Sequence, residues 1–127
     1  MNAGELMAKA VQAAASARLL LEAGDADGAC NRAYYAMFDA ARAVLLASGA
    51  DVGKTHRGVL NTFSEKLVKT GHVPVNMGRI LKLAEAFRYV ADYEGDRVEL
   101  SDARRMVEQS DSFVSGLNAA FPQVKVG

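Results

Sequence analysis

The chain has 127 residues, half of them hydrophobic and 24% charged, which is the composition of an ordinary soluble globular protein. Its fifteen lysine and arginine residues balance fifteen aspartate and glutamate residues, so the formal net charge is zero. A protein that coats nucleic acid non-specifically is normally basic, so this balance argues against that class and leaves a local phosphate-binding patch open. The length fits one domain with its own core over residues 1–127.

A single cysteine, Cys30, rules out an internal disulfide, and its place in a helical run is typical of a small buried hydrophobe. No uninterrupted apolar stretch approaches about 18 residues, and no charged N-terminal region precedes an apolar run and a small-residue cleavage site. We therefore expect a cytoplasmic protein without a membrane span.

Helical spacing of apolar residues predicts five helices, and strand-like alternation is missing almost everywhere. Asn76 and Ser101 are the expected caps of the last two helices, and Ala50–Lys54 and Glu94–Arg97 are expected loops. The first helix is expected from about Glu5 to Ala23. The second is capped by Asp25 or Asp27 and ends near Ser48, and the third is capped by Thr55 and ends near Lys69. The fourth is expected from Met77 to about Asp92 and the fifth from Asp102 to about Ala120. Because the predicted connections are short, we expect an all-α, up-and-down bundle of four long helices and one shorter helix.

The second predicted helix carries polar groups within an apolar stretch, NRAYYAMFDAARAVLL. At 100° per residue, Arg32, Tyr35, Asp39 and Arg42 fall on one side, opposite the alanines that form the core face. Two interpretations are open. In one, the polar groups are exposed helical pairs such as Asp39 and Arg42, which stabilise a helix by only about 0.2–0.5 kcal/mol. In the other, they belong to a functional site.

A second mixed set, EAFRYVADYEGDR, ends the fourth predicted helix. Arg88 and Asp92 stand one turn apart and can pair. If the helix continues through Tyr93, the directions of Arg88 and Tyr93 diverge by roughly 140°. If the helix unwinds near Asp92, as Gly95 suggests, the side chain of Tyr93 can point towards Arg88.

His56 follows the expected cap Thr55 in the segment GKTHRGV, so it should lie in the first turn of the third helix. With Lys54 and Arg57 beside it, this helix start is a candidate anion site. Carboxylates and histidines do not cluster at ligand spacing, so we expect no metal site and no cofactor.

Four segments resemble HEPN domains of bacteria and archaea in their order and separation: NRAYYAMFDAARAVLL, KTHRGVLNTF, KTGHV and FRYVADY. The resemblance implies an all-α bundle, often a homodimer, that is frequently encoded beside a minimal nucleotidyltransferase in a toxin-antitoxin-like pair. Many HEPN proteins are metal-independent RNases, whose signature is an arginine and a histidine with four to six residues between them, at the end of a late helix. In that chemistry the arginine stabilises charge on the scissile phosphate and the histidine moves the proton of the attacking 2′-hydroxyl.

This chain departs from the signature where the histidine should stand. Arg88 matches the arginine, but the possible histidine positions hold Tyr93, Glu94 and Gly95. Tyrosine has a reference pKa near 10 and is a poor general base at neutral pH. His56 is the alternative, because the start of the third helix and the end of the fourth can meet at one end of an antiparallel bundle.

Three hypotheses follow. In the favoured one, a HEPN-type module binds nucleotide or RNA phosphate, or a nucleotidyltransferase partner. Modification of the Tyr93 hydroxyl by such a partner is a separate extension of this hypothesis. The residues of this predicted site are Arg32, Tyr35, Asp39, Arg88, Asp92 and Tyr93. In the second, the chain is a metal-independent endoribonuclease toxin that acts as a homodimer through Arg88, Tyr93 and His56. In the third, a purely structural one, the polar groups form a buried network that locks the second and fourth helices together.

Overall fold

The computed structural model describes residues 1–50, 55–93 and 98–124, which are helical or loop and contain no strand. The elements are α1 (Ala3–Glu22), α2 (Ala26–Ala47), α3 (His56–Phe63), the π-helical turn η1 (Ser64–Val68), α4 (Val75–Tyr93), α5 (Leu100–Ala120) and the 3-10 turn η2 (Pro122–Val124). Helices α1, α2, α4 and α5 span 19 to 22 residues each, and α3 spans eight. The predicted all-α bundle of four long helices and one shorter helix is therefore confirmed.

Side-chain caps explain where three helices begin. Asp25 accepts a hydrogen bond from the backbone nitrogen of Gly28 at 2.8 Å, and Thr55 accepts one from Gly58 at 3.1 Å. Asn2 caps α1 in the same way. These bonds satisfy backbone donors that a helix start leaves without an intrahelical partner. At the other end of α1, Gly24 has a φ of +82°, a left-handed conformation that ends the helix at little steric cost.

Two predicted caps are wrong. Helix α4 already begins at Val75, so Asn76 lies inside its first turn, and Pro74 precedes the helix where its missing N–H breaks no intrahelical bond. Helix α5 begins at Leu100, after Glu99 in an extended conformation, so Ser101 also lies in the first turn. Of the predicted loops, residues 51–54 and 94–97 lie outside the described residues.

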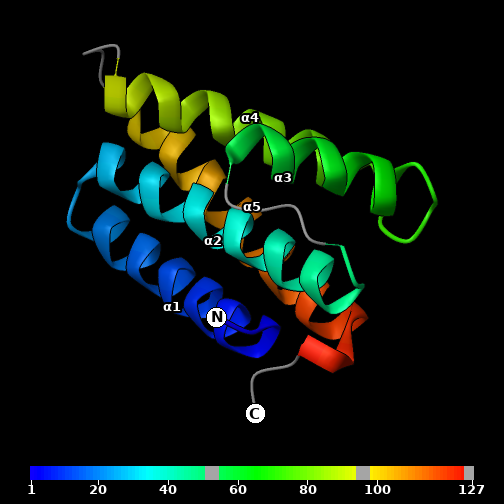
Figure 1. The fold of residues 1–127 in the computed structure, drawn as a ribbon. Helices are drawn as coiled ribbons and strands as arrows, with labels where there is room; N and C mark the ends of the chain where they lie inside the picture. The colour runs from blue at the N-terminus through cyan, green and yellow to red at the C-terminus, as the bar shows by residue number, and fades with distance from the viewer. Residues whose placement is uncertain (51–54, 94–97, 125–127) are drawn as a thin grey trace.

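Helix α2 occupies the centre of the bundle, where it contacts α1, α3, α4 and α5 (Figure 1). Small side chains form much of its interface with the antiparallel α1, and this permits a close approach of the two helices. The fully or almost fully buried alanines are Ala10, Ala13, Ala14 and Ala17 of α1 and Ala29, Ala33, Ala36, Ala40, Ala41 and Ala43 of α2. The α3–α4 hairpin lies along another side of α2, so one face of α2 meets the start of α3 and the C-terminal half of α4.

The described helices include none that combines the length and the apolar character needed to cross a bilayer.

Candidate functional site

A cluster of polar and aromatic side chains joins α2, α3 and α4. At its centre the hydroxyl oxygen of Tyr34 lies 2.5 Å from Nδ1 of His56, and the same nitrogen lies 3.6 Å from Oε2 of Glu85. Glu85 in turn binds Arg88. We call the set the His56–Arg88 cluster, and its members are Asn31, Arg32, Tyr34, Tyr35, His56, Glu85, Arg88 and Asp92.

Arg88 is buried, with 5% of its surface exposed, and carboxylates surround its guanidinium. Its Nη2 donates to both oxygens of Glu85, at 3.0 and 3.1 Å, and its Nη1 lies 3.7 Å from Oδ2 of Asp92. The cation also sits 5.1 Å from the ring centroid of Tyr34, in cation–π geometry. Burial alone lowers the pKa of Arg88, but the hydrogen bond and charge of Glu85 outweigh it and the net pKa is raised. The guanidinium is therefore a permanent positive charge inside the cluster.

The cluster extends outwards along α2. Nδ2 of Asn31 donates to the carboxylate of Asp92, at 3.1 and 3.4 Å, while Oδ1 of Asn31 accepts from Nε of Arg32 at 3.2 Å. The guanidinium of Arg32 lies 5.3 Å from the ring centroid of Tyr35. Arg32 is thus connected to Arg88 within a single chain through Asn31 and Asp92, and its side chain is held over an aromatic ring.

Aromatic rings orient the imidazole of His56. It stacks on Tyr34, with centroids 5.5 Å apart and an interplanar angle of 14°, and contacts Phe38 at 4.8 Å and Tyr35 at 5.8 Å. Tyr34 is fully buried, and burial, together with the nearby carboxylate of Glu85, raises its pKa. The phenol therefore stays protonated and available as a hydrogen-bond donor, whereas 37% of the His56 side chain faces solvent.

The predicted site residues fall into three groups. Arg32, Tyr35, Arg88 and Asp92 join the cluster, together with His56. Asp39 has Lys9, Arg42 and Arg32 as its charged neighbours, and no described contact links it to Arg88 or Asp92. Burial raises the pKa of Asp39 more than these three cations lower it. Tyr93 is the last residue of α4, so the helix does not unwind at Asp92, but its side chain lies outside the described part of the chain.

Sequence reasoning missed three members of the cluster: Asn31, Tyr34 and Glu85. Helical spacing assigned Tyr34 to the apolar face, which is correct for its ring but not for its hydroxyl. Glu85 lies three residues before Arg88, a spacing at which helical side chains meet, so this pair was detectable. Asn31 gave no such signal, because its partner Asp92 is 61 residues away.

Comparison with known proteins identifies the family. The model of the HEPN domain matches residues 3–118. The chain belongs to the HEPN domain family. It is 37% identical over 112 residues to a UPF0332 protein of Gloeobacter violaceus, a match that covers 87% of this chain and 88% of the relative. It is 30% identical over 109 residues to a protein of Methanocaldococcus jannaschii named "Putative toxin MJ0605", covering 86% and 81% of the two chains. A UPF0332 protein of Thermotoga maritima is 32% identical over 111 residues, covering 86% and 83%.

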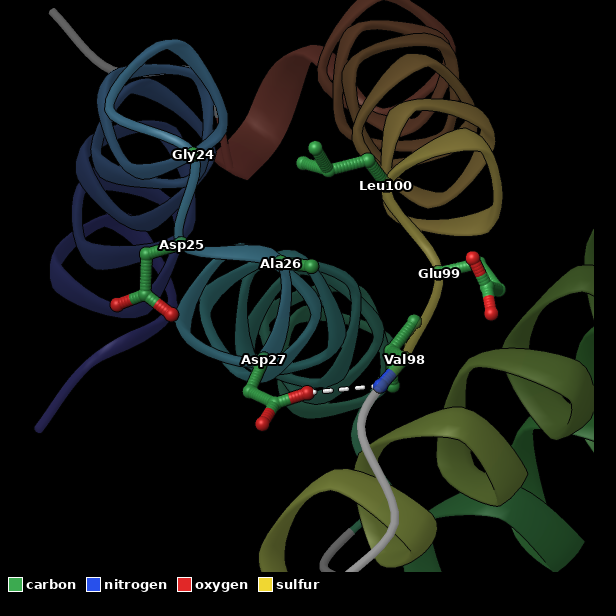
Figure 2. Close-up of a pocket in the computed structure, with 7 residues that line it drawn as sticks. All are labelled: Gly24, Asp25, Ala26, Asp27, Val98, Glu99 and Leu100. Carbon is green, nitrogen blue, oxygen red and sulfur yellow. Dashed lines mark hydrogen bonds between the residues drawn. The ribbon is translucent and has the colours of Figure 1, made fainter.

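This HEPN domain also has a surface hollow of about 560 Å³ at the start of α2, one turn before Asn31. Gly24–Asp27 and Val98–Leu100 line it, and Oδ1 of Asp27 accepts a hydrogen bond from the backbone nitrogen of Val98 at 2.9 Å (Figure 2). Its charged side chains, Asp25, Asp27 and Glu99, are all acidic. A phosphate group would be repelled there, so the hollow does not compete with the cluster as an anion site. Among the described residues, no three histidines, cysteines, aspartates or glutamates group as metal ligands.

Cys30 of the HEPN domain is buried, as predicted. Burial raises the pKa of its thiol to about 12, and the negative charges of Asp27 and Asp102 add to the effect. The reactive species is the thiolate, so near pH 8 the folded protein should react with a disulfide reagent at least about 100-fold more slowly than the urea-unfolded chain. The measurement is the rate of thiol release with and without urea, and equal rates would show that the thiol is accessible in the folded state.

Proposed function

We propose that this HEPN domain is the toxin component of a toxin-antitoxin-like pair and binds the phosphate backbone of RNA at the His56–Arg88 cluster. The supporting observation is the unbroken series of contacts from Arg32 through Asn31, Asp92, Arg88 and Glu85 to His56. It holds a surface cation and a half-exposed imidazole in a fixed relation. The relative with "toxin" in its name is consistent with this proposal. A homodimer and a nucleotidyltransferase partner stay predictions.

The two arginines of the cluster have different roles in the proposed binding of RNA. Arg32 is half-buried, lies over the Tyr35 ring and has nitrogens besides Nε with which to reach a phosphate oxygen. Arg88 is buried against two carboxylates, so its role is to hold Asp92 and Glu85 in place rather than to contact phosphate directly. The rings of Tyr35 and His56 supply aromatic surface on which an unpaired base can stack.

Replacing Arg32 by alanine tests the proposal. We expect the affinity for a short fluorescent single-stranded RNA to fall about tenfold at moderate salt, with the salt slope of the logarithm of the binding constant reduced by about 1. Fluorescence anisotropy measures both quantities. Arg104→Ala, which removes an exposed charge from α5, is the matched control and should bind like the natural chain. Equal affinities of the Arg32 and Arg104 variants, or no RNA binding by the natural chain, would refute the proposal.

A second candidate function, metal-independent RNA cleavage, is favoured by the position of His56. In this candidate His56 of α3 takes the role of the histidine that the signature lacks after Arg88; both His56 and Arg88 contact Glu85. In this candidate the imidazole takes the proton of a 2′-hydroxyl, and the 2′-oxygen forms a bond to phosphorus as the bond to the 5′-oxygen breaks. The 5′-oxygen leaves with a proton from the imidazolium, and a 2′,3′-cyclic phosphate remains.

Cleavage of a 2′-hydroxyl RNA in the presence of EDTA, with the matching 2′-deoxy oligonucleotide left intact, is the expected outcome for this candidate. Product chains that end in a cyclic phosphate, detected by mass spectrometry, would identify the mechanism. Intact RNA after prolonged incubation at high protein concentration would leave RNA binding as the function.

A further inference from the structure

We infer, on the basis of the proposed function, that the groove between η1 and α4 is a second anion subsite. It holds the phosphate backbone of an RNA strand that extends beyond the His56–Arg88 cluster, and it therefore sets the path and the preferred length of the RNA. We call this hollow the α4 groove. The residues that line it are Ser64, Val68, Val75, Gly78, Arg79 and Lys82.

The shape of the α4 groove depends on a glycine and on the π-helical turn. A Cβ atom at Gly78 would lie only 3.2 Å from Cγ2 of Val68, so glycine permits η1 to pack closely against α4. In η1 the backbone nitrogen of Lys69 donates to the backbone oxygen of Ser64 at 2.9 Å, and such π-helical turns occur frequently at functional sites. The hollow has a volume of about 220 Å³, below the roughly 300–1,000 Å³ of pockets that enclose a whole ligand. It therefore suits one phosphate group of a longer molecule.

The charge of the α4 groove favours an anion. Its charged lining residues, Arg79 and Lys82, are both cations, and Ser64 adds a hydroxyl donor. Arg79 and Lys82 are exposed, stand three residues apart on α4, and form no ion pair within the described part of the chain. Side chains at this spacing are neighbours, so the two like charges repel each other until an anion lies between them. Glu85 is the carboxylate at helical spacing from Lys82, and Arg88 already binds it.

The α4 groove lies along the same seam of the bundle as the cluster. Helix α3 and η1 form one segment that packs against the antiparallel α4 (Figure 1). His56 contacts Glu85 at one end of this seam, and the groove occupies the other end. Lys82 and Arg79 precede Arg88 by six and nine residues, which is roughly 9 and 14 Å along the helix axis. Phosphates of a stacked strand are about 3.4 Å apart along its axis, so the groove lies about three to four nucleotides from the cluster.

Charge complementarity and this continuity identify the occupant as a single RNA strand. A phosphate backbone carries one negative charge per nucleotide, so a strand bound at Arg32 and Tyr35 has further charges to place. The acidic hollow at the start of α2 repels them, whereas the α4 groove neutralises them. An RNA that reaches both places should therefore bind more tightly than one that covers the cluster alone.

Two fluorescent RNAs test this inference, one of about three nucleotides and one of about ten, because only the longer strand spans the distance to the groove. A longer strand also offers more binding registers to any site, so the readout is the difference between the natural chain and a variant. We expect Arg79→Ala combined with Lys82→Ala to weaken binding of the longer RNA about tenfold and to lower its salt slope by about 1.4. The affinity for the shorter RNA should not change. Fluorescence anisotropy at several salt concentrations measures these quantities.

Two further double variants serve as controls. Arg104→Ala with Arg105→Ala removes the same charge from exposed positions of α5, and it should bind both RNAs like the natural chain. Arg79→Lys with Lys82→Arg keeps both charges in the groove, and it should keep most of the affinity for the longer RNA. The thermal midpoint of each variant shows whether it is folded.

The possible outcomes separate this inference from the proposed function. If the groove variant and the α5 variant bind the longer RNA equally well, the inference is wrong, while binding of the shorter RNA at the cluster still supports the proposed function. If the natural chain binds neither RNA, both are refuted. A glutamate-rich peptide that binds the natural chain but not the groove variant, with RNA binding unchanged, would identify an acidic protein segment as the occupant and would also overturn the inference.

Discussion

Arg88→Met is expected to lower the free energy of unfolding by about 2–4 kcal/mol. The methionine keeps most of the apolar stem, so the loss comes from the charge. Without the guanidinium, Glu85 loses both of its hydrogen bonds from Arg88 and Asp92 loses its cation. Removing one partner of a fully buried ion pair costs about 3–5 kcal/mol, but the side chains of Glu85 and Asp92 are 30% and 28% exposed and recover part of this from water.

Urea denaturation measures the change, and Arg79→Met on the same helix is the matched control. Arg79 is exposed, so its replacement should change the free energy of unfolding by less than about 0.5 kcal/mol. The same variant separates the binding and structural hypotheses. If the cluster were only a structural lock, folded Arg88→Met would bind RNA like the natural chain. In our account it binds more weakly, because Asp92 no longer holds Asn31 and Arg32 in place. A loss of stability no larger than that of Arg79→Met would contradict both hypotheses.

His56→Ala is expected to lower the rate of RNA cleavage by about 100-fold or more if the domain is an endoribonuclease. The effect should be this large because the imidazole side chain is 37% exposed and can reach a 2′-hydroxyl, while the Tyr34 hydroxyl is buried and its pKa is raised. Product formation from a labelled RNA in EDTA measures the rate.

His72→Ala is the control for this prediction, because His72 is exposed and bonded to Thr70 outside the cluster. His56 also packs on Tyr34 and Phe38, so the thermal midpoint of both variants has to be measured alongside. Equal cleavage by folded His56→Ala and His72→Ala would exclude His56 as the general base.

Local patterns were sufficient to predict the fold. Helical spacing, glycine stops and the caps at Asp25 and Thr55 are properties of neighbouring residues, and they gave the number, order and approximate bounds of the helices. The errors were local as well. Asn76 and Ser101 have good capping side chains, so the sequence predicts helix starts there. The helices begin one or more residues earlier, directly after Pro74 and after the extended Glu99.

The candidate site was only half predictable, because its decisive contacts cross the bundle. The motifs on α2 and α4 identified Arg32, Tyr35, Arg88 and Asp92, since each set is visible within one helix. An antiparallel bundle allows the start of α3 to approach α4, so His56 could be named as a candidate, but spacing could not show that its contacts are Tyr34 and Glu85. Asp39 shows the reverse case: it shares a helix side with Arg32, which is one of its charged neighbours, but Lys9 from α1 is another, and no described contact links Asp39 to Arg88 or Asp92.

The central claim, that RNA binds at the His56–Arg88 cluster, is tested most directly by titrating the ¹⁵N-labelled protein with a short single-stranded RNA and following every assigned resonance. We expect the largest saturable shifts at Asn31, Arg32, Tyr35 and the His56 ring, with little change at the acidic hollow around Asp25 and Asp27. Shifts concentrated at that hollow or on α5, or no saturable shift at all, would contradict the account.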